Sequence, residues 1–193
     1  MSRVVLGVSG ASGAALALAC AEKLARLGAE IDLVVSAMAE RTLAEEVGPQ
    51  ALAGLCAMAA RVHPQRDLGA AIASGSCPVA GMIVAPCSMR SLAAIAHGFD
   101  DSLLTRAAGV QLKERRPLVL LAREAPLTLA HLRNMQAAAE MGAVILPPVP
   151  AFYLRPASLT EAVAQIAARA VDLLHLAPPQ AGAWNPEAKG NHP

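Results

Sequence analysis

The sequence is poor in aromatic residues and has no long apolar run. Its only aromatic residues are Phe99, Phe152, Tyr153 and Trp184, so few rings are available to stack on nucleic-acid bases. The formal net charge of +1 at pH 7 provides no broad basic surface for phosphates, and we therefore expect no nucleic-acid partner. The apolar runs are far shorter than the ~18 residues that a membrane-spanning helix needs, so we also expect no membrane insertion.

The cysteines and histidines lack the spacing of disulfide or metal-binding clusters. No C-x-x-C pair occurs among Cys20, Cys56, Cys77 and Cys87, and no secretory segment opens the chain. This pattern predicts a reduced, cytoplasmic protein without a disulfide framework. No two histidines stand four residues apart, so we expect no metal site.

Alanine and leucine are abundant instead. Of the 193 residues, 55% are hydrophobic and only 16% are charged, which excludes a disordered chain. A chain of this length can bury one substantial core, so we expect one domain. Small helix-favouring residues let helices pack closely and leave apolar faces over for partner subunits, and we therefore expect a homo-oligomer.

Short apolar segments alternate with segments of helical character. We expect strands at residues 3–8, 31–35, 81–85, 117–121 and 143–146. Helices are expected to follow each of them, whereas residues 61–80 are expected to be mostly loop. Continuous apolar strands that alternate with helices predict a parallel sheet covered on both faces, in a three-layer α/β domain. Ligands of such domains lie outside the carboxyl ends of the strands.

Two of the predicted strands end in turns that carry serine. Residues 10–13, Gly-Ala-Ser-Gly, begin a helix whose free N–H groups offer a docking place for a phosphate or an electron-rich ring edge. On this motif alone, Ser12 as a simple helix cap is an equally good interpretation. Ser88 caps a second helix start after the strand at 81–85, and two neighbouring starts favour an anion or cofactor cradle. For Cys87, a buried thiol is a better interpretation than a nucleophile, because no histidine lies near it in the sequence.

Charged and aromatic residues follow two further strands. Arg123 and Glu124 stand after a buried strand, where a charged pair has no structural purpose unless it faces a ligand. Phe152 and Tyr153 suggest a wall against a flat or apolar ligand. Trp184, in a tail rich in proline and glycine, is either an exposed residue or part of a lid folded over a site.

Several segments taken together resemble one known family. They are GVSGASGA at residues 7–14, ASGS at 73–76, APCSMRSLAAIAHG at 85–98, RAAGVQLKERRPLVLLARE at 106–124 and GAVILPPVPAFY at 142–153. The chain resembles flavin prenyltransferases of the UbiX type, within the flavin-binding homo-oligomeric Cys decarboxylase-like group, over about residues 3–176. The resemblance implies a flavodoxin-like Rossmann fold for residues 1–176, assembled into a dodecamer, and it makes the tail (177–193) a possible lid over the active site.

The resemblance also implies an activity, the metal-independent transfer of a dimethylallyl group from dimethylallyl phosphate to N5 and C6 of reduced FMN. The prenylated FMN would serve a UbiD-type decarboxylase. Breaking an allylic C–O bond leaves a phosphate dianion and a delocalised cation, so the site needs fixed positive charge at one end and an aromatic face at the other. Lys113, Arg106 and Arg169 would supply the charge in place of Mg²⁺. Trp184 or Tyr153 would supply the aromatic face.

The functional residues of the family are carried over by matching position. FMN would be held by Gly10, Ala11, Ser12, Ser36, Ser88, Met89, Arg90, Ser91 and Arg123. The prenyl phosphate would be held by Ser74, Arg106, Lys113, Tyr153 and Arg169. Catalytic roles would fall to Ser12, Glu46, Lys113, Glu124 and Trp184. Of these, the two glutamates are expected to handle protons around the flavin.

Two positions depart from the family pattern, and two alternative functions stay open. Leu68 stands where relatives can carry Trp beside the substrate, which removes one aromatic face, and Leu154 stands where His is common. One alternative is a related FMN-dependent decarboxylase of cysteine-type substrates, whose early catalytic His and Asn-rich segment the chain lacks. The other is a non-catalytic FMN-binding subunit, which would tolerate loss of functional residues that are all in place here.

Overall fold

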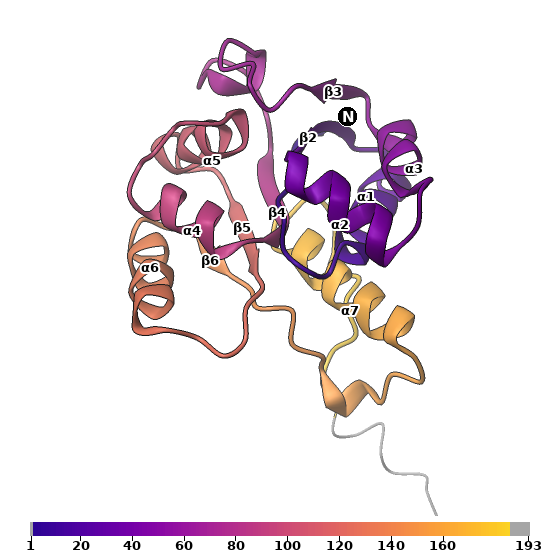
Figure 1. Ribbon diagram of the computed structural model, residues 1–193. Coiled ribbons are helices and arrows are strands. Elements are labelled where there is room, and N and C mark those ends of the chain that lie inside the picture. The colour runs from indigo at the N-terminus through magenta and orange to yellow at the C-terminus, as the bar shows by residue number, and fades with distance from the viewer. Residues whose placement is uncertain (1, 186–193) are drawn as a thin grey trace, which may run out of the picture.

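The structure, a computed structural model, describes residues 2–185 and consists of a β-sheet between two layers of helices (Figure 1). The strands are β1 (Arg3–Val8), β2 (Glu30–Val35), β3 (Arg61–His63), β4 (Gly81–Cys87), β5 (Leu118–Ala122) and β6 (Val144–Ile145). Their order is β3-β2-β1-β4-β5-β6, and every neighbouring pair is parallel. This is the order of the doubly wound Rossmann fold, and without the three-residue edge strand β3 the remaining five strands have the flavodoxin-like order 2-1-3-4-5. The predicted three-layer α/β sandwich, flavodoxin-like and with a parallel sheet, is therefore confirmed.

The helices divide into two layers, each with its own hydrophobic core. One layer contains α1 (Ala15–Arg26), α2 (Ala37–Glu46), α3 (Ala51–Met58) and α7 (Leu159–Asp172), and the other contains α4 (Met89–Ala96), α5 (Leu103–Lys113) and α6 (Leu129–Glu140). Along β1, Val4 and Leu6 face the first layer, whereas Val5 faces the second. Because both faces of a central strand are buried, the strands are continuous apolar runs. No helix within residues 2–185 is long and apolar enough to cross a membrane.

The strand order places a crevice at one edge of the sheet. From β1 the chain crosses to β2 on one side, while β4 pairs with the other side of β1. The connections that leave β1 and β4 therefore diverge, and this switch point opens a ligand crevice at the carboxyl ends of the strands. The turns that begin at Ser9 and Ser88 lie there.

The segment at residues 61–80 was expected to be mostly loop, and this is partly wrong. Arg61–His63 form the edge strand β3, and Ala71–Ala73 form a 3₁₀ turn. Strand β3 has only three residues, two of them polar, so it carries no periodic pattern to detect. Strand β4 also extends to Cys87, two residues past its expected end.

A buried carboxylate ties the edge strand to the sheet. Asp32 of β2 has a fully buried side chain, and its Oδ1 accepts a hydrogen bond from Nη2 of Arg3 (2.8 Å). The same oxygen bonds Nε2 of His63 (2.6 Å). Since Arg3 lies on β1 and His63 on β3, Asp32 joins three neighbouring strands. Asp32 stands within the apolar strand predicted at residues 31–35, and its sequence context indicates no partner.

Candidate active site

Ser9 joins the two turns at the switch point. Its hydroxyl is buried, donates to the carbonyl oxygen of Pro86 (3.0 Å) and accepts from the N–H of Ser88 (2.7 Å). The predicted neighbourhood of the two helix starts is therefore real, and it is fixed by hydrogen bonds. Ser9 itself was not among the predicted site residues. Its signal was only that it is the first polar residue after β1.

A cavity of about 510 Å³ opens beside these turns. From the predicted FMN-binding set it is lined by Gly10, Ser36, Ser88, Arg90 and Ser91, and from residues not predicted by Ser9, Ala37, Met38, Gln65, Arg66, Asp101 and Ser102. The serines are held in place because Ser36 caps α2 and Ser88 caps α4. At position 10 only glycine fits, since a methyl group would stand 2.3 Å from Cβ of Met38.

Glu46 occupies the N-terminus of α1. Its Oε2 accepts hydrogen bonds from the N–H groups of Gly13 and Ala14, both at 2.8 Å. The expectation of free N–H groups at this helix start is therefore wrong for Gly13 and Ala14, because a carboxylate of the protein binds both. Docking of a phosphate or an electron-rich ring edge at residues 10–13 stays a prediction. The interpretation of Ser12 as a simple helix cap is wrong as well. The N-cap residue of α1 is Ala14, and the N-cap makes no side-chain hydrogen bond to the helix.

The charge of Glu46 is well stabilised. Burial alone would raise its pKa, but hydrogen bonds from Ala14, Ser12 and Gly13, together with the charge of Arg123, lower the pKa below the usual value for glutamate. Glu46 is thus a carboxylate at neutral pH. In this state it is able to accept a proton or orient a donor, and it is not a proton donor.

Replacing Glu46 with glutamine should reveal this contact. The amide would keep the size of the side chain but lose the charge at the helix N-terminus, so we expect the free energy of unfolding at pH 7 to fall by about 1 kcal/mol. Because the pKa of Glu46 is lowered on folding, this difference should be present at neutral pH and vanish as the pH falls through the folded-state pKa. Thermal melts from pH 7 to pH 3 test this. Glu45→Gln is the matched control, because Glu45 forms an exposed pair with Arg41. This substitution should change the free energy of unfolding by less than about 0.5 kcal/mol. Equal losses in both variants would contradict the role of Glu46.

Glu46, Ser12 and Arg123 share a second cavity, of about 480 Å³. Its polar side is formed by these three residues and its apolar side by Leu16, Pro148, Pro150, Leu159, Val163 and Ile166. The structure therefore brings together three of the predicted residues on an apolar wall. Glu124 does not line this cavity, and its carboxylate accepts a hydrogen bond from the N–H of Ala125 (3.0 Å).

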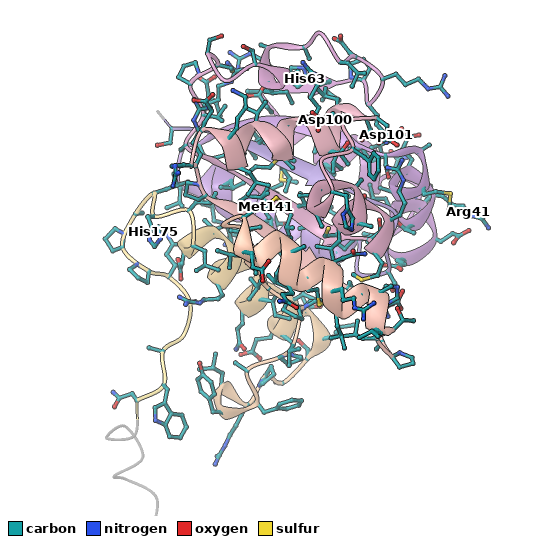
Figure 2. All side chains as sticks on the ribbon, turned by 90° about the vertical axis from the view of Figure 1, so that its left-hand side faces the viewer. Arg41, His63, Asp100, Asp101, Met141 and His175 are labelled. Atoms are coloured by element: carbon teal, nitrogen blue, oxygen red, sulfur yellow. The ribbon has the colours of Figure 1, made fainter. Side chains whose placement is uncertain are left out.

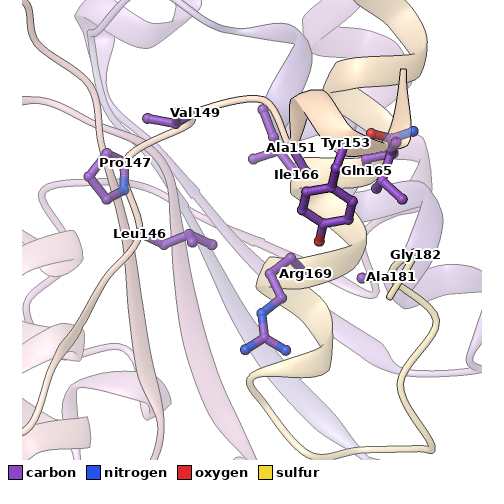
Figure 3. A pocket seen from close by; sticks show the side chains of 11 residues that line it. Leu146, Pro147, Val149, Ala151, Tyr153, Gln165, Ile166, Arg169, Ala181 and Gly182 are labelled. Carbon is purple, nitrogen blue, oxygen red and sulfur yellow. The ribbon is translucent and has the colours of Figure 1, made fainter. Parts of the chain in front are cut away.

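A third, smaller cavity of about 150 Å³ adjoins the second, because Ile166 lines both. Tyr153 and Arg169 point into it from the 3₁₀ turn Phe152–Leu154 and from α7 (Figure 3). Gln165 also lines it, and among residues 2–185 its buried Oε1 finds no hydrogen-bond partner. Gln165 was not among the predicted site residues, because it belongs to no motif. Its only signal is that it lies four residues before Arg169, on the same face of α7.

Trp184 lies on Tyr153. The ring centroids are 5.4 Å apart and the planes meet at 88°, an edge-to-face pair. Trp184 is also 55% exposed. The structure thus places the tail beside Tyr153, and its role as a lid stays a prediction. The other half of the tail, residues 186–193, lies outside the described residues.

The remaining predicted phosphate ligands lie elsewhere on the chain. Arg106 and Lys113 line a cavity of about 520 Å³ on the face formed by α4, α5 and α6. Asp100 and Met141, which also line it, are labelled in Figure 2. The loop that holds Ser74 lies close to Lys113. A methyl group added to Gly75, the next residue, would stand only 2.5 Å from Nζ of Lys113. Lys113 pairs with Glu114, and Ser74 pairs with a neighbouring serine. One copy of the chain thus does not bring these residues to Tyr153 and Arg169.

Ala11, Met89 and Cys87 make local contacts or are buried. Ala11 donates its N–H to the carbonyl of Ser9 (2.8 Å), and Met89 opens α4 and packs partly against the core. Cys87 is fully buried, and burial raises the pKa of its thiol to about 12. It is therefore protonated, which agrees with the buried-thiol interpretation rather than with a nucleophile.

Comparison with known proteins decides the family. The family model described as Flavoprotein matches residues 1–170. The flavin prenyltransferase UbiX of Thauera aromatica is 50% identical over 182 residues, which cover 94% of this chain and 93% of that protein. The UbiX of Escherichia coli K12 is 47% identical over 181 residues, which cover 93% and 95% of the two chains. The chain belongs to the UbiX family of flavin prenyltransferases.

Solved structures agree with this assignment. A crystal structure of AnUbiX in complex with FMN and dimethylallyl pyrophosphate has a TM-score of 0.90 and 44% identity, over 95% of this chain and 97% of that one. A dodecameric FMN-dependent UbiX-like decarboxylase from Escherichia coli O157:H7 has a TM-score of 0.89 and 41% identity, over 95% and 99% of the two chains. The FMN-dependent cysteine decarboxylase TvaF is 16% identical and shares the fold alone.

Proposed function

We propose that this protein is a flavin prenyltransferase that transfers the dimethylallyl group of dimethylallyl phosphate to N5 and C6 of reduced FMN. The observation that carries the proposal is a pair of neighbouring sites at the carboxyl edge of the sheet, one rich in hydroxyls and one combining a carboxylate and a guanidinium with an apolar wall. A relative that is 44% identical binds FMN and dimethylallyl pyrophosphate. The product would serve a UbiD-type decarboxylase, in the cytoplasm.

The residues at the switch point fit FMN. The first cavity offers hydroxyl donors and acceptors on Ser36, Ser88 and Ser91, with Arg90 at its rim, for the polar tail of the cofactor. Arg123 and the apolar wall of the second cavity suit the edge and the face of a planar ring system. Reduced FMN supplies the nucleophilic ring atoms of the reaction. Glu46, as an ionised group beside Ser12, is placed to accept a proton from that ring or to orient a group that does.

The prenyl donor needs positive charge and an aromatic face, which the chain offers in two separate places. Tyr153 and Arg169 form the aromatic place, and the ring of Trp184 contacts the ring of Tyr153. Arg106 and Lys113 form the cationic place, and Nε of Arg106 is buried there without a hydrogen-bond partner among residues 2–185, as expected of a group that awaits an anion. We infer that a second copy of the chain brings Arg106 and Lys113 to the phosphate.

Exposed apolar side chains support such an assembly. Among the described residues, Phe99, Leu129, Leu132, Phe152 and Leu159 each expose half or more of their surface. Exposed apolar side chains of this size and number fit a surface that meets partner chains. We propose a homo-oligomer, with a dodecamer as the expected size, in which residues 1–176 form the enzyme domain and the tail lies at the active site.

The decisive experiment mixes this protein with reduced FMN and dimethylallyl phosphate in the absence of oxygen. We expect the mass of the flavin to rise by one C5 unit, measured by mass spectrometry after the protein is removed. Parallel reactions with dimethylallyl diphosphate establish which donor is preferred. A flavin of unchanged mass with both donors would contradict the proposed function.

A further inference from the structure

The chain returns to the site after α7 through a short tail segment. Ala181 and Gly182 line the small cavity that also holds Tyr153 and Arg169. Gly182 lies against Leu154, because a methyl group on Gly182 would stand 2.9 Å from Cδ2 of Leu154. Two residues later, the ring of Trp184 meets the ring of Tyr153. The tail therefore forms one wall of the site.

The start of this segment is bound by the side chain of Asp172. Asp172 is the last residue of α7 and only 8% exposed. Its Oδ1 accepts the N–H of Gln180 and its Oδ2 accepts the N–H of Ala181, both at 2.8 Å. Two successive N–H groups bound by the two oxygens of one carboxylate fix both the position and the direction of the chain. Bonds to an ionised acceptor are also stronger than ordinary hydrogen bonds.

Asp172 has no other evident purpose. A negative charge in the last turn of a helix is unfavourable, because the carbonyl end of the helix is itself negative. Among residues 2–185, no lysine or arginine forms an ion pair with Asp172. Burying a carboxylate is unfavourable, and the two hydrogen bonds from the tail offset this cost.

Asp172 is also linked to the site through its own helix. It stands one turn after Arg169, whose side chain points into the cavity. The helix thus sets the distance between Arg169 and the tail segment that lines the same cavity. We propose that Asp172 is a positioning residue that holds Trp184 over Tyr153, and so closes the pocket of the prenyl group. The consequence for turnover rests on the proposed function, whereas the placement of the tail does not.

The chain contains a single tryptophan, so its fluorescence reports the tail directly. We expect Asp172→Ala to increase the fast local motion of Trp184 in time-resolved anisotropy of the full-length protein, and to make Trp184 easier to quench with acrylamide. Asp172→Asn keeps one acceptor oxygen and should lie between Asp172→Ala and the natural chain. Glu140→Ala is the matched control, since Glu140 is the exposed last residue of α6 and bonds only Gln136; it should leave the fluorescence unchanged.

The kinetic expectation is a rise of about tenfold in KM for dimethylallyl phosphate, with a smaller change in kcat and with FMN affinity kept. Ala181→Pro removes one of the two N–H donors while leaving Asp172 intact, so it tests the same contact should Asp172→Ala not fold. Unchanged anisotropy and quenching in folded Asp172→Ala, or in Ala181→Pro, would overturn the proposal. If the fluorescence changes as expected but the natural protein prenylates no flavin, the positioning role stands and the proposed function fails.

Discussion

Replacing Arg106 with methionine is expected to lower kcat/KM for dimethylallyl phosphate by about 100-fold while leaving FMN binding intact. Methionine keeps much of the length and packing of the side chain but removes the charge. In the structure Arg106 shares its cavity with Lys113, and its buried Nε is without a partner among residues 2–185. The phosphate leaves with both bonding electrons, so its negative charge increases in the transition state. The loss of a fixed cation therefore destabilises the transition state more than it destabilises the bound substrate.

Two variants make this prediction specific. Arg106→Lys keeps the charge but not the planar fork of donors, so it should recover only part of the activity. Arg41→Met is the control, because Arg41 forms an exposed helix pair with Glu45, and such pairs contribute little. Steady-state rates of prenyl-flavin formation and a separate FMN titration provide the two readouts. A loss of FMN affinity equal to the loss of rate would show that Arg106 serves the cofactor and not the prenyl phosphate.

A mixing experiment tests whether the site lies between copies. Arg169→Met and Arg106→Met chains, expressed together with different tags, form mixed oligomers. If Arg169 of one copy and Arg106 of another meet in one site, roughly a quarter of the sites in random mixtures carry neither substitution, and activity returns to about that level. If both residues act within one chain, every site is damaged and no activity returns.

The fold could be predicted because its strands are long enough to show a pattern. Val4, Leu6 and their neighbours form continuous apolar runs since both faces of the sheet are covered, and this signal is local. Strand β3 was missed because three residues on a sheet edge, paired on one side only, carry no such run. Its place is set by a contact across the sheet, between Asp32 and His63, which no local pattern contains.

Site residues that directly follow a strand could be predicted from the sequence. Site residues that depend on contacts between distant parts of the sequence could not. Ser36 and Ser88 are recognisable as caps, because each stands directly between a strand and a helix. The bond from Glu46 to the start of α1 joins residues more than thirty positions apart, so the N–H groups at that helix start looked free. Asp172 is similarly silent in the sequence, because an aspartate near the end of a helix resembles any surface charge.

Asp32 should be the polar side chain on which stability depends most. We expect Asp32→Ala to lower the free energy of unfolding by about 3 kcal/mol at pH 7, because it leaves the charge of Arg3 half-buried and unpaired. His63 loses its side-chain partner on β2 in the same step, so the edge strand β3 should be loosened first. Glu30→Gln is the matched control on the same strand, since Glu30 forms only an exposed pair with Arg61, worth at most about 1 kcal/mol.

The pH dependence separates the charge of Asp32 from its shape. Burial alone would raise the pKa of Asp32, but the hydrogen bonds and charges of Arg3 and His63 lower it below the usual value. A carboxylate whose pKa falls on folding contributes stability above its unfolded pKa of about 4, and that contribution is lost as the pH falls through the folded pKa. Urea melts of the natural chain and of Asp32→Asn should therefore differ most at neutral pH and converge as the pH falls through the folded-state pKa of Asp32. A difference that does not shrink as the pH falls would mean that the amide fails for steric reasons, and that the charge of Asp32 contributes nothing to stability.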